Sequence, residues 1–369
     1  MTLAKKTLVV SGINIVETGV LSVFQDCLKA LVPYAELHQI RVVVLAHSPE
    51  IIANIPFETH YFPKSKKSWW FRSYYEYFYF PKWIKSLQPT AWLSLQDLSP
   101  HLPGVQTAVY CHNPCMYLKT RLQDMWYGPK IVAFAWFYQW AYRVNIRSNK
   151  RVVVQQQWMR DDFRKRFQLP QCVTLRPQTQ VAVQPQKVVL APNVIHLFYP
   201  VSARMFKNVE YLVAAVQLLT ADEQKGVQVH LTLTGNENAY ARKLFRMAKN
   251  RPLFQWHGRM SRAQTAGFYA VMDALVYCSR LETWGLPITE AIEFDKPLLL
   301  ADLPYAHETA SDYPKIAWHN LNNPQELADS IRLLINGKTI IDPKPKAAPT
   351  ADLADWTELF DILLDTSCL

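Results

Sequence analysis

The chain has 369 residues, with 40 Lys or Arg against 30 Asp or Glu, which gives a formal net charge of +10. Half of the residues are apolar and only 19% are charged, so a disordered tail and a coiled coil are excluded and about two domains are expected. The aromatic share of 13% is more than a core of this size needs. We therefore expect some of the rings to face something other than water.

Membrane-spanning and secreted classes do not fit the sequence. No stretch reaches the roughly 18–20 uninterrupted apolar residues of a spanning helix, and the start lacks the apolar segment and cleavage site of a secretory signal. Six scattered cysteines are typical of a reducing cytoplasm. Cys111, His112 and Cys115 are spaced like half of a metal site, but no second pair follows at zinc spacing, so we predict no metal and no other cofactor.

Short β-branched runs alternate with amphipathic stretches, which is typical of a parallel sheet covered by helices. In the first half of the chain, strands are expected at residues 7–10, 41–46, 91–95, 107–110 and 151–155. A segment rich in Gln and Pro, 168–187, then links to a second set of strands, expected at 188–190, 195–199, 227–233, 253–257, 274–277 and 297–301. The pattern predicts an α/β protein with two Rossmann-like domains, residues 1–180 and 187–345, that face a cleft.

The last segment has an apolar face at helical spacing. That face is formed by Leu353, Trp356, Phe360, Leu363 and Leu364, and a break rich in Lys and Pro precedes it. We therefore expect residues 350–369 to form a helix that returns to the N-terminal domain.

The most specific string is SRLETWGLPITEAIEFDKPLLL, in which seven residues separate Glu282 from Glu290. Because Pro287 suits the start of a helix, Glu282 is expected on a loop at the carboxyl edge of the sheet and Glu290 about one turn into the helix. The free amides of Trp284 to Leu286 would then face the cleft, and amides at a helix start bind anions. Alone, two glutamates at this spacing are more often solvated helix charges.

In this strand–loop–helix context the string resembles the E-x7-E motif of the retaining glycosyltransferases of family four, which have the GT-B fold. The resemblance covers most of the chain. The segment ETWGLPITEA, followed by ADLPYAHETA, is most similar to bacterial transferases that build O-antigen or capsular polysaccharide. It implies that Glu282 contacts hydroxyls of the donor sugar and that Glu290 binds the ribose of the nucleotide. The intervening residues, which would face the sugar and diphosphate, are Thr283, Trp284, Gly285 and Leu286.

Two cations follow the expected strand 195–199. Arg204 and Lys207 precede an amphipathic helix for which Asn208 is the expected N-cap, so both cations and the positive end of the helix point to one place. A departing nucleoside diphosphate needs positive charge there. Taken alone, Arg204 and Lys207 would be interpreted as surface cations. The resemblance implies instead that they form the family's diphosphate clamp. The nucleotide base is expected to contact the backbone near Gly258 and Arg259, where a strand ends.

The first half offers four weaker candidates. Gly19 lies in a loop after the first strand, where the family often has two adjacent glycines and this chain has one; it is predicted to contact the donor, with a turn glycine as the alternative. His112 follows the strand 107–110 and matches the family's histidine that faces the donor sugar, with a structural histidine as the alternative. Asp97 and Asn113 are predicted to contact the acceptor, and Asp97 is otherwise a turn-capping residue.

The mechanism follows partly from what the sequence lacks. It has no D-x-D triplet of the metal-dependent type, and Glu282 and Glu290 both belong to the donor-binding wall rather than to opposite sides of a sugar. We therefore expect same-face transfer in which the departing phosphate oxygen takes the proton of the acceptor. The resemblance implies that the anomeric configuration is retained.

Aromatic and basic residues gather in the segments 64–83 and 125–147. Such rings and cations suit the headgroup level of a membrane that a protein does not cross. We expect the protein to lie on the cytoplasmic face of the cell membrane and to receive a lipid-linked oligosaccharide. The predicted contacts with the anionic surface are Trp69, Trp70, Lys66, Lys67 and Trp136. The alternative is an aromatic core helix with a solvated basic face.

Other function classes fit less well. No recognised nucleic-acid motif appears, so we predict no nucleic-acid partner. A nucleotide-sugar epimerase of the same architecture and a non-catalytic protein of the membrane surface remain as alternatives to the transferase.

Overall fold

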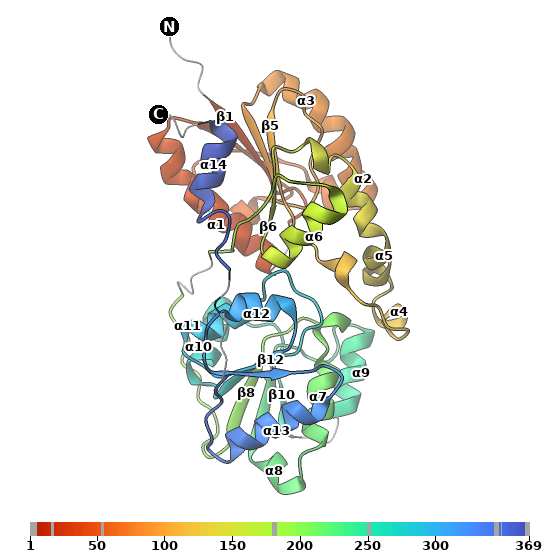
Figure 1. The fold of residues 1–369 in the computed structure, drawn as a ribbon, viewed down its shortest axis with the longest axis vertical. Coiled ribbons are helices and arrows are strands. Elements are labelled where there is room, and N and C mark those ends of the chain that lie inside the picture. Colours follow the sequence, from red (N-terminus) through yellow and green to blue (C-terminus); the bar gives the residue numbers. More distant parts are fainter. Residues whose placement is uncertain are drawn as a thin grey trace. The chain divides into compact units, whose positions relative to one another are not determined.

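The chain forms two compact units, each built on a parallel sheet (Figure 1). The first unit comprises residues 1–113, 137–179 and 350–369, and the second comprises 114–136 and 180–349. The predicted α/β class with two Rossmann-like domains is confirmed. The computed structural model describes residues 6–15, 18–52, 55–178, 183–248, 252–342, 347 and 349–365.

The first domain has a seven-stranded sheet in the order β3-β2-β1-β4-β5-β6-β7. Its strands are β1 (Thr7–Ser11), β2 (Arg41–Ala46), β3 (Glu58–Tyr61), β4 (Ala91–Ser94), β5 (Gln106–Tyr110), β6 (Arg151–Val154) and β7 (Cys172–Thr174). The two edge strands were not predicted. β3 has no buried residue, and β7 lies in the Gln- and Pro-rich segment that the sequence predicts to be a linker. Neither has the apolar run of a central strand.

Helices and short helical turns surround this sheet. They are α1 (Thr18–Leu37), α2 (Trp69–Tyr74), a π-helical turn (Tyr75–Tyr79), α3 (Phe80–Leu87), α6 (Gln157–Phe167) and α14 (Trp356–Leu364), with 3-10 turns at Pro49–Ile52, Pro63–Lys66 and Ile146–Ser148. Helix α5 (Pro129–Arg143) belongs to the first domain only from residue 137 on. Alternate residues of the strands pack on opposite faces. Val10 and Val44 belong to one apolar cluster, and Val9 and Val43 to the other.

The C-terminal helix docks on the first domain, as predicted. Trp356, Leu359 and Phe360 are buried in the same cluster as residues of α1, β4 and β5. Tyr34 on α1 donates a hydrogen bond of 2.7 Å to Asp361 on α14. In Figure 1 the blue α14 lies beside the red α1.

The second domain has a six-stranded sheet in the order β10-β9-β8-β11-β12-β13. Its strands are β8 (Ile195–Tyr199), β9 (Val227–Leu231), β10 (Phe254–Trp256), β11 (Ala274–Tyr277), β12 (Leu298–Ala301) and β13 (Ile316–His319). The helices are α4 (Asp124–Tyr127), α7 (Val209–Gln217), α8 (Ala221–Lys225), α9 (Ala239–Ala248), α10 (Arg262–Val271), α11 (Leu286–Glu293), α12 (Pro304–Ala310) and α13 (Pro324–Ile335), with 3-10 turns at Cys115–Tyr117 and Met205–Lys207.

The strand predicted at 188–190 is wrong. The segment is irregular, and the preceding Gln186 donates its amide to the carbonyl of Ala263 at the start of α10. These residues therefore run along α10, and their apolar character reflects packing on the core rather than a place in the sheet. β13 was not predicted, because only its first and last residues are buried.

Residues 114–136 group with the second domain, although the predicted boundary lay at residue 180. Leu118 and Val132 belong to its core cluster. Asp124 forms a 2.7 Å ion pair with Arg280, and both side chains are almost fully buried. A segment from the first half of the sequence thus completes the core of the second domain.

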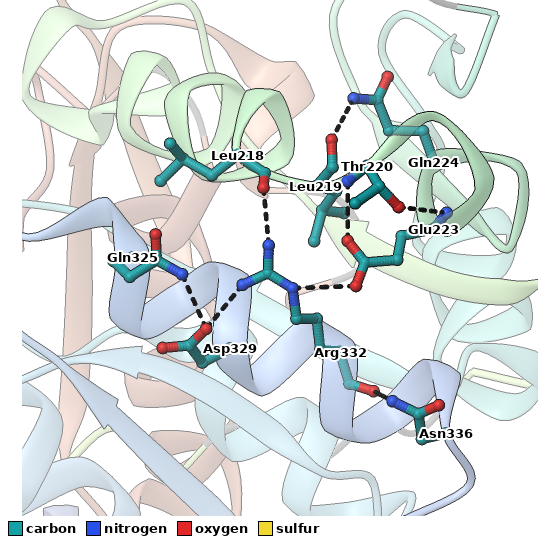
Figure 2. Close-up of polar contacts among 9 residues, drawn as sticks. All are labelled: Leu218, Leu219, Thr220, Glu223, Gln224, Gln325, Asp329, Arg332 and Asn336. Carbon is teal, nitrogen blue, oxygen red and sulfur yellow. Dashed lines mark hydrogen bonds and ion pairs between the residues drawn. The ribbon is translucent and has the colours of Figure 1, made fainter.

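One arginine joins three helices of the second domain (Figure 2). Arg332 on α13 pairs with Glu223 at 3.0 Å and with Asp329 at 2.7 Å, and it donates to the carbonyl of Leu218 after α7. Glu223 also accepts the amide of Thr220, which closes the capping box of α8. The C-terminal ends of α7 and α13 and the start of α8 are thereby linked.

Replacing Leu359 by Ala should lower the free energy of unfolding of the first domain by about 2–5 kcal/mol, because a buried side chain would leave a cavity. Urea denaturation followed by tryptophan fluorescence measures the change. The matched control is Leu37→Ala, the same replacement at an exposed position of α1, which should cost less than about 0.5 kcal/mol. Equal effects of the two variants would contradict the docking of α14.

Candidate functional site

The carboxyl edge of the second sheet brings the predicted residues together. β8 pairs with β9 on one side and with β11 on the other, so the strand order reverses between β8 and β11. In open α/β sheets, ligands bind at such a reversal, beyond the carboxyl ends of the strands. The loop of Arg204 and Lys207 follows β8, and the loop of Glu282 follows β11, so both flank this point.

Lys207 and Glu282 form an ion pair with Nζ 2.5 Å from Oε1. The two side chains are only 14% and 15% exposed. Lys207 Nζ also lies 3.2 Å from the hydroxyl of Tyr277, the last residue of β11, and 5.4 Å from the centre of its ring. Burial and the Glu282 carboxylate raise the pKa of Tyr277, so the phenol keeps its proton. The ammonium is therefore held in a fixed place by two partners from the neighbouring strand and loop.

The backbone supports this position from the β8 side. The hydroxyl of Tyr199 donates to the carbonyl of Lys207 at 2.5 Å. Asn208 has a left-handed conformation (φ 57°) at the N-cap position of α7, but its side chain makes no capping hydrogen bond. It donates instead to the carbonyl of Cys278 at 3.3 Å. The predicted N-cap position is therefore confirmed, but the side chain connects the two loops rather than capping the helix. Arg204 is exposed, and its side chain has no hydrogen bond or ion pair among the described residues.

Helix α11 begins where the Gly-Leu-Pro turn predicted it. Gly285 is its N-cap with φ 91°, a left-handed conformation that favours glycine, and Pro287 lies in its first turn. Trp284 is buried: its Nε1 donates to Thr289 at 3.1 Å, and its carbonyl accepts from the hydroxyl of Thr309. The turn before the helix is thus fixed by contacts with α11 and α12.

Glu290 lies in the second turn of α11, as predicted. Its carboxylate accepts a 2.7 Å hydrogen bond from the hydroxyl of Tyr269 on α10. Burial raises the pKa of Glu290, while Tyr269 opposes that increase. Thr283 and Leu286, the other predicted donor contacts, are half-buried.

Gly258 and Arg259 follow β10 at the same edge of the sheet. Gly258 has φ 73° and donates its amide to the carbonyl of Leu233 at 3.0 Å. Arg259 is exposed and lines a cavity of about 300 Å³. The predicted base-binding loop therefore adjoins a real cavity within the second domain.

In the first domain, Asp97 organises the loop that follows β5. Its Oδ1 accepts from the amides of His112 (2.6 Å) and Asn113 (2.9 Å) and from the hydroxyl of Tyr142 (3.0 Å). Its Oδ2 accepts from the hydroxyl of Tyr138 at 3.0 Å. Four hydrogen bonds to one carboxylate favour a structural role for Asp97 over contact with an acceptor hydroxyl.

The ring of His112 stacks on Tyr110 with centroids 4.6 Å apart. Burial lowers the pKa of His112 to about 4, against the opposing effect of Asp97, so the imidazole is neutral at physiological pH. Neither ring nitrogen has a hydrogen-bond partner among the described residues. Gly19 lies in the first turn of α1, and the neighbouring residues 16–17 are outside the described residues.

Two tyrosines were missed by sequence reasoning. Tyr277 holds Lys207, and Tyr269 holds Glu290. The place of Tyr277 at the end of a predicted strand was a usable signal. Tyr269 offered none, because its contact depends on how α10 and α11 pack. Within the described residues, no group of three or more His, Cys, Asp or Glu side chains is placed to hold a metal ion, and the metal-free reaction stays a prediction.

Comparison with known proteins bears on the fold and on the second domain. Residues 184–348 match the family model described as Glycosyl transferases group 1. No curated protein matches the chain. HepE of Anabaena, solved with UDP and glucose, is 14% identical over 89% of this chain and 90% of its own, with a TM-score of 0.61. The lipopolysaccharide outer core galactosyltransferase WaaB is 12% identical over 90% of both chains, with a TM-score of 0.60.

A third similar structure is sucrose-phosphate synthase from Thermosynechococcus elongatus. It is 13% identical over 89% of this chain and 90% of its own, with a TM-score of 0.63. At such low identities these likenesses establish the fold, in agreement with the two parallel sheets. The chain therefore has the two-domain GT-B fold, and residues 184–348 of its second domain match the group 1 glycosyltransferase model.

Proposed function

We propose that this protein is a retaining glycosyltransferase that moves a sugar from a nucleoside-diphosphate donor to a lipid-linked glycan without a metal ion. The observation that carries the proposal is the Lys207–Glu282 ion pair at the reversal point of the second sheet, with Glu290 on the adjoining helix. The acceptor belongs to a bacterial surface polysaccharide, O-antigen or capsule. The structural similarity to WaaB, which is described as a lipopolysaccharide outer core galactosyltransferase, supports this class of acceptor.

Each residue of the site has a part in this reaction. Lys207 and the exposed Arg204 counter the negative charge that grows on the diphosphate as the glycosidic bond breaks. Lys207 needs little rearrangement, because Glu282 and Tyr277 already fix its ammonium. Glu282 binds hydroxyls of the sugar, Glu290 binds the ribose, and the turn from Thr283 to Leu286 faces the sugar and diphosphate.

The chemistry needs no base from the protein. The bond between the anomeric carbon and the phosphate oxygen breaks, the acceptor oxygen bonds to that carbon on the same face, and the phosphate oxygen takes the acceptor's proton. The neutral ring of His112 suits a hydrogen bond to a sugar hydroxyl better than a charge contact. Asn113 and Gly19 remain predicted ligand contacts in the first domain.

The experiment incubates the full chain with UDP, GDP and dTDP sugars and a lipid-linked oligosaccharide. The nucleotide released and the glycan formed are identified, and NMR determines the anomeric configuration of the new bond. We expect one nucleotide to be released together with a product of retained configuration. Conversion of the donor into its epimer without an acceptor would favour the epimerase instead.

Lys207→Ala and Glu282→Ala should each lower kcat/KM by about 100-fold or more, the range seen when an electrostatic contact to the developing charge is lost. Each variant removes one partner of the ion pair at the reversal point. Circular dichroism should show that both variants fold. Lys225→Ala is the matched control, because Lys225 pairs with Asp222 at the exposed end of α8 and should leave turnover unchanged. Unchanged turnover in both site variants would contradict the assignment of Lys207 and Glu282 to the active site.

Exposed aromatic residues support a membrane-bound acceptor. The side chain of Trp70 is 82% exposed, and Trp69, Phe71, Tyr74 and Phe78 are also exposed on α2 and the π-helical turn. The predicted contact Trp136 of α5 is exposed but belongs to the second unit. In the first unit, Trp69 contacts Tyr138 of α5 with ring centroids 6.2 Å apart, and α5 also exposes Phe137 and Trp140. We call these residues of α2, the π-helical turn and α5 the aromatic surface.

Exposed aromatic side chains that lie near one another are typical of sites that bind a protein or a membrane. Lys66 and Lys67 adjoin it at the start of α2. No helix in the described part of the chain is both long and apolar enough to cross a membrane. We therefore propose that the protein binds the cytoplasmic leaflet peripherally, with the rings at headgroup level and the lysines over anionic lipid.

Replacing Trp69 and Trp70 by Ser should weaken binding to vesicles that contain anionic lipid by about tenfold or more, because two aromatic side chains lose apolar burial. Sedimentation with vesicles measures the change. Leu37→Ser, at an exposed apolar position on α1, is the control and should bind as the parent does. Equal sedimentation of the double variant would count against the membrane proposal and leave the transfer chemistry untouched.

A further inference from the structure

Three histidines of the second domain form one chain of hydrogen bonds. His196 Nδ1 lies 2.9 Å from His230 Nε2, and His230 Nδ1 lies 2.9 Å from His257 Nε2. They come from β8, β9 and the residue after β10. In the strand register, each histidine lies two residues nearer the carboxyl edge of the sheet than the one before it. The three side chains therefore lie on the same face of the sheet, which Phe268 of α10 covers.

A backbone carbonyl sets the direction of this chain. His196 Nε2 lies 2.8 Å from the carbonyl oxygen of Ala191, which can only accept, so this nitrogen carries the proton. In a neutral ring Nδ1 is then an acceptor, and it must receive Nε2–H of His230. By the same step His230 Nδ1 receives Nε2–H of His257. This row of hydrogen bonds thus leaves His257 Nδ1 as an unprotonated acceptor.

Burial favours the neutral form of His230 and His257. His196 and His230 are buried, and burial lowers the pKa of His230 to about 3, with further lowering from His257 and His196. Partial burial of the ring also lowers the pKa of His257, although the residue as a whole is exposed. When the three rings are neutral, the hydrogen bonds allow only the arrangement derived above. Its free end is the Nδ1 lone pair of His257, which makes no hydrogen bond within the described residues.

His257 lines the cavity of about 300 Å³ that adjoins the predicted base-binding loop. Apolar walls come from Val188, Met260 and Phe268. Gln264 also lines it, and its polarity is fixed: Oε1 accepts the amide of Ser261 at 2.9 Å in the capping box of α10, so Nε2 is left as the donor. The remaining lining residues are Gln186, Lys187 and Arg259. The cavity therefore combines one fixed acceptor with several donors.

We infer that this cavity binds the imide edge of uracil or thymine, with the ring N3–H donating to His257 Nδ1, so that the sugar donor is a uridine or thymidine diphosphate sugar. This inference rests on the proposed function, since it names the base of that donor. The imide edge presents a donor between two carbonyl acceptors. Gln264 and Lys187 offer N–H groups for those carbonyls.

The other bases match the fixed groups less well. Cytosine and adenine present a ring nitrogen acceptor on this edge, which would meet the lone pair of His257 with no proton between them. Guanine presents two adjacent donors, N1–H and its amino group, and so needs a second acceptor beside His257. Of the two groups whose polarity the scaffold fixes, Gln264 supplies a donor and not that acceptor. A site built around a hydrogen bond rejects ligands that leave it unpaired.

The first experiment measures, by titration calorimetry on the full chain, the Kd values of UDP, dTDP, CDP, GDP and ADP. We expect UDP and dTDP to bind at least about tenfold tighter than the others, the size of one good hydrogen bond. His257→Phe keeps an aromatic ring against Phe268 and removes the acceptor, so it should weaken UDP binding by about tenfold and leave pyrophosphate binding unchanged. Tighter binding of GDP, or equal loss for UDP and pyrophosphate, would overturn the inference.

The second experiment tests the polarity without reference to activity. Long-range nitrogen–proton NMR of the histidine side chains at pH 7.5 should show His257 with a protonated Nε2 and a pyridine-like Nδ1, and the Nδ1 signal should shift on addition of UDP. A protonated Nδ1 would overturn the inference. If the enzyme transfers sugar from a GDP donor, the inference fails while the proposed function stands; if UDP binds as expected without transfer, the proposed function fails and the base assignment survives.

Discussion

The ion pair between Lys207 and Glu282 joins two loops that are 75 residues apart in the sequence. They meet because β8 and β11 are parallel neighbours, so both loops leave the sheet at the same edge. Helix α11 begins shortly after Glu282 with the Gly285 turn, and Glu290 lies in its second turn. The rest of the proposed donor site is arranged around this one contact, which fixes a positive charge where a diphosphate would need it.

Much of the fold was readable from the chain, because central strands of parallel sheets are short buried runs of β-branched residues. β2, β8 and β11 lie where those runs predict them, and the apolar spacing around Trp356 identified α14. The failures have a physical pattern. β3, β7 and β13 are edge or short strands with few buried residues, and the run at 188–190 is apolar because it packs beside α10, which a local pattern cannot distinguish from pairing in a sheet.

The candidate site was readable only in part. The spacing of Glu282 and Glu290 with a glycine turn indicated a loop and a helix start, and the structure has both. Contacts that depend on packing between elements gave no local signal. Tyr269 reaches Glu290 from another helix, and the histidine chain joins three strands across sequence separations of 34 and 27 residues. None of these histidines has a distinctive sequence context, and the direction of their hydrogen bonds is set only when the sheet is assembled.

Neither domain is a continuous stretch of sequence, and this bears on how the protein is made. Residues 114–136 leave the ribosome well before β8 to β13, yet their Asp124 neutralises Arg280 inside the second domain. Conversely, the sheet of the first domain is synthesised long before α14, which covers part of it. The second domain can close as soon as its own strands are made, because residues 114–136 are already present. The first domain must wait for α14, so part of its apolar face is uncovered while the second domain is being synthesised.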